Sequence, residues 1–293
     1  MKADVLVAEI GSTTTLINAF CGIRSGEPKF IGQGQAPTSV LEGDVRIGLN
    51  GAIEDLKANL GADKIEYGEM LATSSAAGGL RMCVHGLVYD MTVKAAEAAA
   101  LGAGAIVTMA TAGKLSEYDI EDLKEAKPNL ILLAGGTDYG EKETALFNAR
   151  MIAASGVKAP VIYAGNVQNK RAVEDIFQKA GISCTVTENV YPKLDKLNIE
   201  PARKIIHQVF EEHIIKAPGM EHIRDMVTGH IMPTPGAVME AVQLAYNEIG
   251  DVVAVDIGGA TTDVHSVTGG SEEIGILLTT PEPFAPRCRK RCG

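Results

Sequence analysis

The chain has 293 residues, which is enough for one large or two modest domains. Hydrophobic residues make up 46% and charged residues 22%, an ordinary globular composition. The net charge of −10 argues against a basic nucleic-acid footprint and against a polybasic membrane surface, so we expect neither partner. A nucleotide site is compatible with this charge, because it needs only local N–H donors and a metal.

The five cysteines form no CxxC pair, and we expect reduced thiols in a cytosolic protein. The apolar run near the start is too short for a signal peptide, and no apolar stretch reaches the length of a membrane span. These features predict a cytoplasmic location. The last eight residues, 286–293, are rich in Cys and Arg, and we expect an unstructured tail there.

The first part of the chain predicts strands and one helix, because runs of β-branched and apolar residues alternate with turns. The helix is indicated by apolar residues at helical spacing. In chain order, strands are expected at residues 4–9, 14–20, 29–34 and 70–73, and the helix at residues 43–60.

The middle of the chain alternates helix and strand, the pattern of a parallel sheet with crossover helices. Ser116, followed by Asp119, predicts a capped helix start. The turn at residues 135–138 has two open interpretations: a ligand-binding loop at the carboxyl end of a strand, or a plain turn in which Asp138 lies at a helix start. Strands are expected at residues 105–109, 129–134, 161–164 and 183–187, and helices at 92–101, 116–126, 141–154 and 168–180.

The last part predicts helices followed by a hairpin. Helices are expected at residues 201–215, 221–226 and 235–249, and strands at 251–256 and 261–267 around a turn at 258–260. The six histidines are scattered, and we expect structural or surface roles for them, with His265 at the sheet surface.

Two segments, residues 7–14 and 255–262, share one pattern: an apolar strand, an acid, Ile, Gly, a small residue and a Thr-rich return strand. A carboxylate at a strand end can hold Mg²⁺ directly or through water. Glycine permits φ > 0 and a close approach of phosphate oxygens, and the turn aims N–H groups and hydroxyls at an anion. Two such turns facing each other predict a clamp on a triphosphate, suited to phosphoryl transfer.

The pattern assigns roles to individual residues. Asp256 and Glu9 are expected to position Mg²⁺ and the attacking water, with Asp256 as the catalytic residue and Asp263 as a further acid on the metal side. The β- and γ-phosphates are expected to be held by Gly11, Ser12, Thr13, Thr14, Gly258, Gly259, Thr261 and Thr262.

Both segments resemble the phosphate motifs of the actin/Hsp70/sugar-kinase superfamily. Residues 232–246 resemble the connecting helix that precedes the second motif, whereas Glu9 stands where most of the superfamily has Asp. The phrases AEIGSTTT, ATSSAAGGLRM, LLAGGTD, NIEPAR and VDIGGATTDVHSV resemble the glutamate mutase accessory protein family, called MutL or GlmL and unrelated to the mismatch-repair protein. The likeness extends to about residue 284.

The resemblance implies an α/β fold of the actin/Hsp70 type, with two RNase H-like halves and an inserted small α/β subdomain. The second half is expected to be cut short. The implied divisions are residues 1–75 for the first half with its hairpin, 76–190 for the insertion, 191–250 for helices completing the first half, 251–285 for the start of the second half and 286–293 for the tail.

The resemblance also implies an ATP-dependent reactivating chaperone for an adenosylcobalamin-dependent mutase of the glutamate mutase or aminomutase type. Such a protein would be a slow ATPase that uses ATP and Mg²⁺, has mutase subunits as partners and meets cobalamin only through them. Two alternatives stay open. One is a small-molecule kinase of the acetate or sugar type, for which no second-substrate motif is found, and the other is a non-hydrolysing scaffold that binds the mutase.

Overall fold

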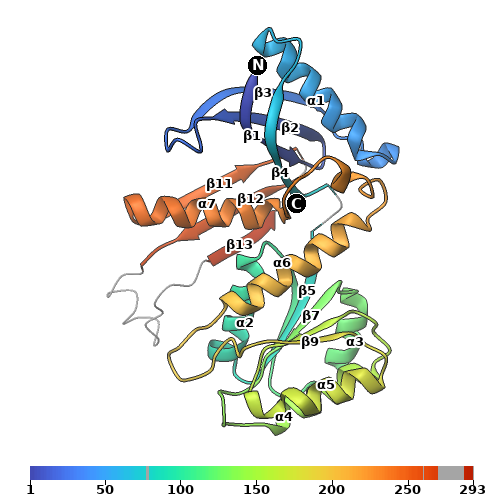
Figure 1. The fold of residues 1–293 in the computed structure, drawn as a ribbon. Helices are drawn as coiled ribbons and strands as arrows, with labels where there is room; N and C mark the ends of the chain where they lie inside the picture. Colours follow the sequence, from blue (N-terminus) through green and yellow to red (C-terminus); the bar gives the residue numbers. More distant parts are fainter. Residues whose placement is uncertain (77–78, 260, 270–286, 293) are drawn as a thin grey trace. The chain divides into compact units, whose positions relative to one another are not determined.

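The structure is a computed structural model that describes residues 1–76, 79–259, 261–269 and 287–292. The chain divides into two compact units (Figure 1). Unit 1 contains the described residues of 1–79, 210–266 and 288–293, and unit 2 those of 80–209 and 267–287. Unit 2 therefore runs beyond the boundary expected at residue 190, and the second hairpin clusters in one unit with the first.

A five-stranded sheet with the order β10-β4-β1-β2-β3 forms the centre of unit 1. β1 pairs antiparallel with β2 and β2 with β3, whereas β1–β4 and β4–β10 are parallel. This order and these directions are those of an RNase H-like half, so the predicted fold class is confirmed. The strands are β1 (Lys2–Ile10), β2 (Thr14–Cys21), β3 (Lys29–Pro37), β4 (Glu66–Ser74) and β10 (Ile231–Pro233).

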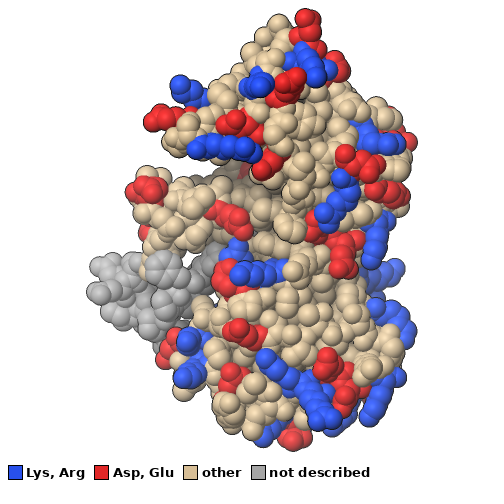
Figure 2. All heavy atoms as spheres, in the orientation of Figure 1, with Lys and Arg blue, Asp and Glu red and all other residues tan. Residues whose placement is uncertain are grey.

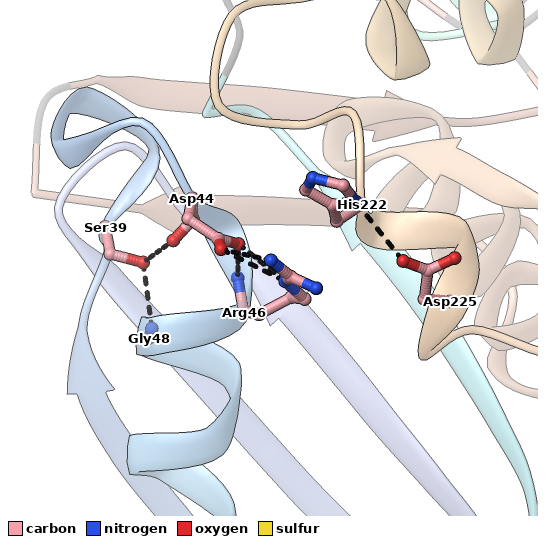
Figure 3. Close-up of polar contacts among 6 residues, drawn as sticks. All are labelled: Ser39, Asp44, Arg46, Gly48, His222 and Asp225. Carbon is pink, nitrogen blue, oxygen red and sulfur yellow. Dashed lines mark hydrogen bonds and ion pairs between the residues drawn. The ribbon is translucent and has the colours of Figure 1, made fainter.

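Helix α1 (Val45–Leu60) packs against β2 and β3. A Cβ at Gly34 of β3 would overlap the backbone and side chain of Leu56, so glycine is required for this close approach. Asp44 caps the helix by accepting a hydrogen bond from Arg46 N at 2.9 Å, as Figure 3 shows. The segment at residues 217–226 docks beside this cap, where Val45 N donates to Gly219 O at 2.7 Å.

The rest of unit 1 begins in the sequence within helix α6, at residue 210. A short 3₁₀ turn replaces the helix predicted at residues 221–226. Strand β12 lies between β11 and β13 in a three-stranded sheet with the order β11-β12-β13. Residues 287–292, where we expected an unstructured tail, form strand β13 in the structure. The bounds are α6 (Glu200–Ile215), η4 (Ile223–Asp225), α7 (Thr234–Ile249), β11 (Val252–Ile257), β12 (Thr262–Val267) and β13 (Arg287–Cys292).

Unit 2 is built on an all-parallel sheet with the order β6-β5-β7-β8-β9. Counted along the chain, this is the 2-1-3-4-5 order of a flavodoxin-like, doubly wound sheet. The sequence predicted a parallel layer but missed β5, the strand between β6 and β7. The strands are β5 (Arg81–Gly86), β6 (Ile106–Ala112), β7 (Leu130–Leu133), β8 (Val161–Tyr163) and β9 (Cys184–Val186).

The helices of unit 2 bury apolar side chains against this sheet. In α5, Val173 and Phe177 are four residues apart and fully buried. Burial of one such side chain contributes about 1.5–3 kcal/mol. The predicted cap of α3 is present as a capping box of Ser116 and Asp119. The helical bounds are η2 (Tyr89–Val93, a π-helix), α2 (Lys94–Gly102), α3 (Glu117–Ala126), α4 (Glu143–Ala154), η3 (Val167–Asn169) and α5 (Lys170–Lys179).

Candidate functional site

The two similar segments fold into hairpins that are closed by the same hydrogen bond. Gly11 N donates to Thr14 O at 3.0 Å, and Gly258 N donates to Thr261 O at 2.9 Å. Each hairpin thus begins at the end of a strand, β1 or β11, and returns as β2 or β12. The likeness seen in the sequence is therefore also a likeness of backbone structure.

At the first hairpin glycine is needed for space, and at the second a side chain would be a tight fit; neither turn uses a left-handed backbone. A Cβ at Gly11 would lie 2.7 Å from Thr14 O, and one at Gly258 would lie 3.3 Å from Thr261 O. Neither these two glycines nor Gly259 has a positive φ. The positive φ that glycine permits is therefore not used at these positions, whereas the close approach that it permits is observed at Gly11.

The first hairpin is held by Thr38, which follows β3. Thr38 N donates to Thr13 O at 3.0 Å, and Thr38 Oγ1 donates to Gly11 O at 2.8 Å. A further hydrogen bond of 3.0 Å joins the hydroxyls of Thr15 and Thr38. These contacts occupy the hairpin carbonyls, while the exposed tip residues Ser12 and Thr13 keep N–H groups without an acceptor among the described residues. Such free amides are donors for an anion.

The two hairpin tips meet within unit 1. A Cβ built on Gly259 would overlap the side-chain hydroxyl of Thr13, so the Gly259 backbone lies directly against that side chain. Thr14, Thr261 and Thr262 lie on the same two hairpins and are exposed or half-buried. Residue 260, the remaining tip position of the second hairpin, lies outside the described residues.

The three predicted acids differ in their surroundings. Glu9 is half-buried, and burial raises its pKa, with a further increase from the nearby negative charge of Asp256. Asp263 on β12 is buried. Within the described residues, no group of three or more His, Cys, Asp and Glu side chains has metal-binding geometry. A divalent ion held here would therefore need ligands beyond these carboxylates.

His265 lies next to this group and was not predicted to belong to it. Its side chain is 1% exposed, and neither ring nitrogen has a hydrogen-bond partner in the described part of the chain. The expectation of a surface position is thus wrong. Burial lowers the His265 pKa, and the charges of Asp263 and Asp256 oppose that decrease. The sequence signal for this position was its spacing, because His265 and Asp263 are two residues apart on one strand and share a face.

Polar residues from β4 and α7 also reach this end of the sheet. Ser75 N donates to Ile10 O at 3.0 Å, directly beside the first hairpin. Thr234, the first residue of α7, donates to Thr73 Oγ1 at 3.4 Å. The sequence indicated the helix that begins here but not its hydroxyl contact with β4.

The surface has no large area of a single charge in the view of Figure 2. On the face drawn in Figure 2, acidic and basic side chains are interspersed. No helix in the described ranges is both long enough and apolar enough to cross a membrane.

Comparison with known proteins gives one family and one curated relative. The family described as MutL protein matches residues 5–289. "Protein MutL" of Clostridium tetanomorphum is 45% identical over 257 residues, which is 85% of this chain and 56% of the relative. The chain thus spans a little over half the length of the curated relative it matches.

Two solved structures show weak likeness. The nucleotide-free acetone carboxylase, from a study of ATP-dependent acetone carboxylation, has 19% identity and a TM-score of 0.37, covering 91% of this chain and 44% of its own. The activator of 2-hydroxyisocaproyl-CoA dehydratase from Clostridium difficile, with bound ADPNP, has 12% identity and a TM-score of 0.19, covering 71% and 96%. At these scores neither carries weight, and the fold assignment depends on the strand order described above. The match over residues 5–289 and the 45% identity place this chain in the MutL protein family.

Proposed function

We propose that this chain forms the phosphate-binding part of an ATP-dependent accessory protein that reactivates an adenosylcobalamin-dependent mutase. The observation that supports it best is the contact between Thr13 and Gly259, because it brings two equivalent hairpins together at their tips. Free amides at Ser12 and Thr13 suit the β- and γ-phosphates of ATP. The remaining proposed phosphate contacts come from Gly11, Thr14, Gly258, Gly259, Thr261 and Thr262.

Mg²⁺ fits the acids of this site. Glu9 and Asp256 are close enough for one charge to raise the pKa of the other, which is the arrangement that a divalent cation relieves. Mg²⁺ is usually held by one or two carboxylates together with substrate phosphates, so a cage made only of protein ligands is not required. Glu9, Asp256 and Asp263 would hold the ion, which supplies charge neutralisation at the phosphates when bound.

Asp256 is the proposed catalytic residue. It is the penultimate residue of β11, just before the second hairpin, where its carboxylate can orient a water molecule beside the terminal phosphate. Hydrolysis would then release the contacts between phosphate and hairpin tips, and this change would drive the opening of the mutase partner. Membership of the MutL protein family supports the accessory role.

The test is a calorimetric titration of this chain with Mg-ATP, followed by turnover measurements on the full-length protein. Asp256→Ala should abolish turnover and weaken Mg-dependent binding by at least about tenfold, or about 1.4 kcal/mol. Glu248→Ala removes a carboxylate from exposed helix α7 of the same unit and serves as the matched control. Unchanged turnover in Asp256→Ala would remove this residue from the mechanism.

Product analysis separates the proposal from its two alternatives. Phosphate release without a phosphorylated product supports the chaperone, and a phosphorylated small molecule would indicate a kinase. Capture of mutase subunits that is equally strong with and without nucleotide would indicate a scaffold.

A further inference from the structure

Unit 2 carries a cleft at the carboxyl edge of its parallel sheet. The loops that follow β7, β8 and β9 enclose about 350 Å³, within the range of small-molecule sites. In doubly wound sheets, ligands bind outside the carboxyl ends of the strands. The polar residues that line the cleft are Asp138, Lys170, Glu188, Asn189, Lys196 and Asn198.

Side-chain hydrogen bonds tie the three loops together. Asp138 Oδ1 accepts from Val167 N at 2.9 Å and from Asn189 Nδ2 at 3.1 Å. Asn189 is buried and also donates to Gly136 O at 3.0 Å. Asp138 therefore joins neighbouring loops and does not cap α4 as the second interpretation of this turn expected. The first interpretation, a ligand-binding loop, stays a prediction. The cleft wall is held in place before any ligand arrives.

Two residues that are next in sequence to the cleft lining have a left-handed backbone. Tyr139 and Asp195 have φ of 63° and 56°, a conformation that non-glycine residues rarely adopt. Each is fixed by a hydrogen bond: Tyr139 N donates to Asn166 Oδ1 at 3.2 Å, and Asp195 N donates to the Tyr191 hydroxyl at 2.9 Å. Strain that the surroundings maintain in this way is common at ligand sites.

The lining carries both signs of charge. Neither Lys170 nor Lys196 forms an ion pair within the described parts of the chain. Glu188 Oε2 accepts from Asn198 Nδ2 at 3.0 Å, and Asp138 uses Oδ1 for its contacts. One oxygen of each carboxylate and both ammonium groups are therefore available to a ligand.

We infer that this cleft binds a small zwitterion, an amino acid. Its carboxylate would be held by Lys170 and Lys196, and its ammonium group by Asp138 and Glu188. Lys170 begins helix α5, so the helix dipole also favours the negative end of the ligand there. A plain anion such as phosphate would meet two carboxylates, and a plain cation would meet two lysines, whereas a zwitterion is complementary to both pairs.

The test is an NMR and calorimetric titration of the intact chain with glycine, L-alanine, L-aspartate, L-glutamate and L-lysine. Acetate, ethylamine and inorganic phosphate are the comparison ligands. At least one amino acid should bind about tenfold or more tightly than any of the three, with shifts at the amides of residues 138–140 and 188–198. Absence of binding at millimolar concentration, or phosphate binding of equal strength, would overturn the inference.

Matched variants locate the site. Lys170→Gln and Lys196→Gln should each weaken amino-acid binding by about tenfold. Lys179→Gln, at the far end of the same helix, should leave it unchanged. Lys196 is exposed, so Lys196→Gln is expected to fold. If Lys170→Gln fails to fold, Lys196→Gln alone decides the outcome. Equal affinity in Lys196→Gln would contradict the assignment. The site uses no hairpin residue, so Asp256→Ala should leave amino-acid binding intact.

Discussion

Glu9, a proposed ligand of Mg²⁺, has a charge that lowers the stability of the folded chain when no metal ion is bound. Because its pKa is raised in the folded chain, ionisation is less favourable there than in the unfolded chain. The free energy of unfolding therefore falls as pH rises from the ordinary glutamate value through the folded value. Residues placed for function often destabilise the free protein in this way.

Glu9→Gln should consequently raise the melting temperature at pH 7 and weaken Mg-dependent ATP binding. The reason is that glutamine removes the partly buried charge beside Asp256 and also removes a proposed metal ligand. Thermal melts and Mg-ATP titrations of the same preparation measure both effects, with Glu248→Gln on exposed helix α7 as the control. A variant that is less stable at pH 7, with ATP binding intact, would contradict both roles.

His85 is a second residue whose protonation is coupled to folding. It is fully buried on β5, and its Nδ1 lies 2.7 Å from Thr111 Oγ1, whereas Nε2 has no partner in the described chain. Burial lowers its pKa from 6.5 to about 4. The unfolded chain thus binds more protons between these values, and stability falls as pH decreases from 6.5 to about 4.

His85→Gln should remove this part of the acid sensitivity. The difference in unfolding free energy between the wild type and the variant should change by about 3 kcal/mol between pH 7 and pH 4. Urea unfolding at several pH values measures it. Parallel pH profiles for the two proteins would show that His85 titrates alike in the folded and unfolded chains.

Among the elements, α1 depends on a charged cap that Figure 3 shows in detail. The Arg46 side chain and backbone both donate to Asp44 and lower its pKa to about 2. Ser39 Oγ completes the corner by accepting from Gly48 N at 2.8 Å and donating to Asp44 O at 2.6 Å. The same picture shows the pair formed by His222 and Asp225, which belongs to the segment docked beside this cap.

Replacement of Asp44 separates capping from charge. Asp44→Asn keeps a cap acceptor and loses the ion pair, whereas Asp44→Ala loses both. At pH 7 the wild type should therefore be the most stable, Asp44→Asn less stable and Asp44→Ala the least stable. The contribution of the charge is complete above pH 3.8 and is lost as pH falls through about 2. Urea unfolding should therefore show the wild type and Asp44→Asn converging near pH 2. If the difference in unfolding free energy between the wild type and Asp44→Asn stayed constant over this pH range, the charge of Asp44 would have no part in the effect.

Elements with strong local signals were predictable. The α3 cap follows from Ser116 and Asp119, and the amphipathic α5 from its spacing, both without any long-range contact. Strand β5 escaped prediction because its short apolar run lies between Arg81 and His85, which read as surface residues. A hydrogen bond between His85 Nδ1 and Thr111 of β6 offsets part of the cost of burying this histidine.

At the scale of the whole molecule, unit 2 has the core and the sheet of an independent domain. A fragment of residues 80–209 should unfold cooperatively, because its sheet and buried core lie within that range. A fragment that starts at residue 88 should not, since β5 is the strand that pairs with both β6 and β7. Thermal melts followed by circular dichroism show whether each of the two fragments unfolds cooperatively. Failure of the longer fragment to fold would show that unit 2 depends on the rest of the chain.

From the sequence alone followed the paired hairpin motifs, the alternation of helix and strand in the middle and the family. The hairpin motifs and the alternation are local patterns, which backbone preference and side-chain period determine. The family followed from the resemblance of whole phrases of sequence. The strand orders, the contact between Thr13 and Gly259, the burial of His265 and the cleft of unit 2 were decided only by tertiary structure. They depend on which distant strands pair and which loops meet, and no local spacing encodes that choice.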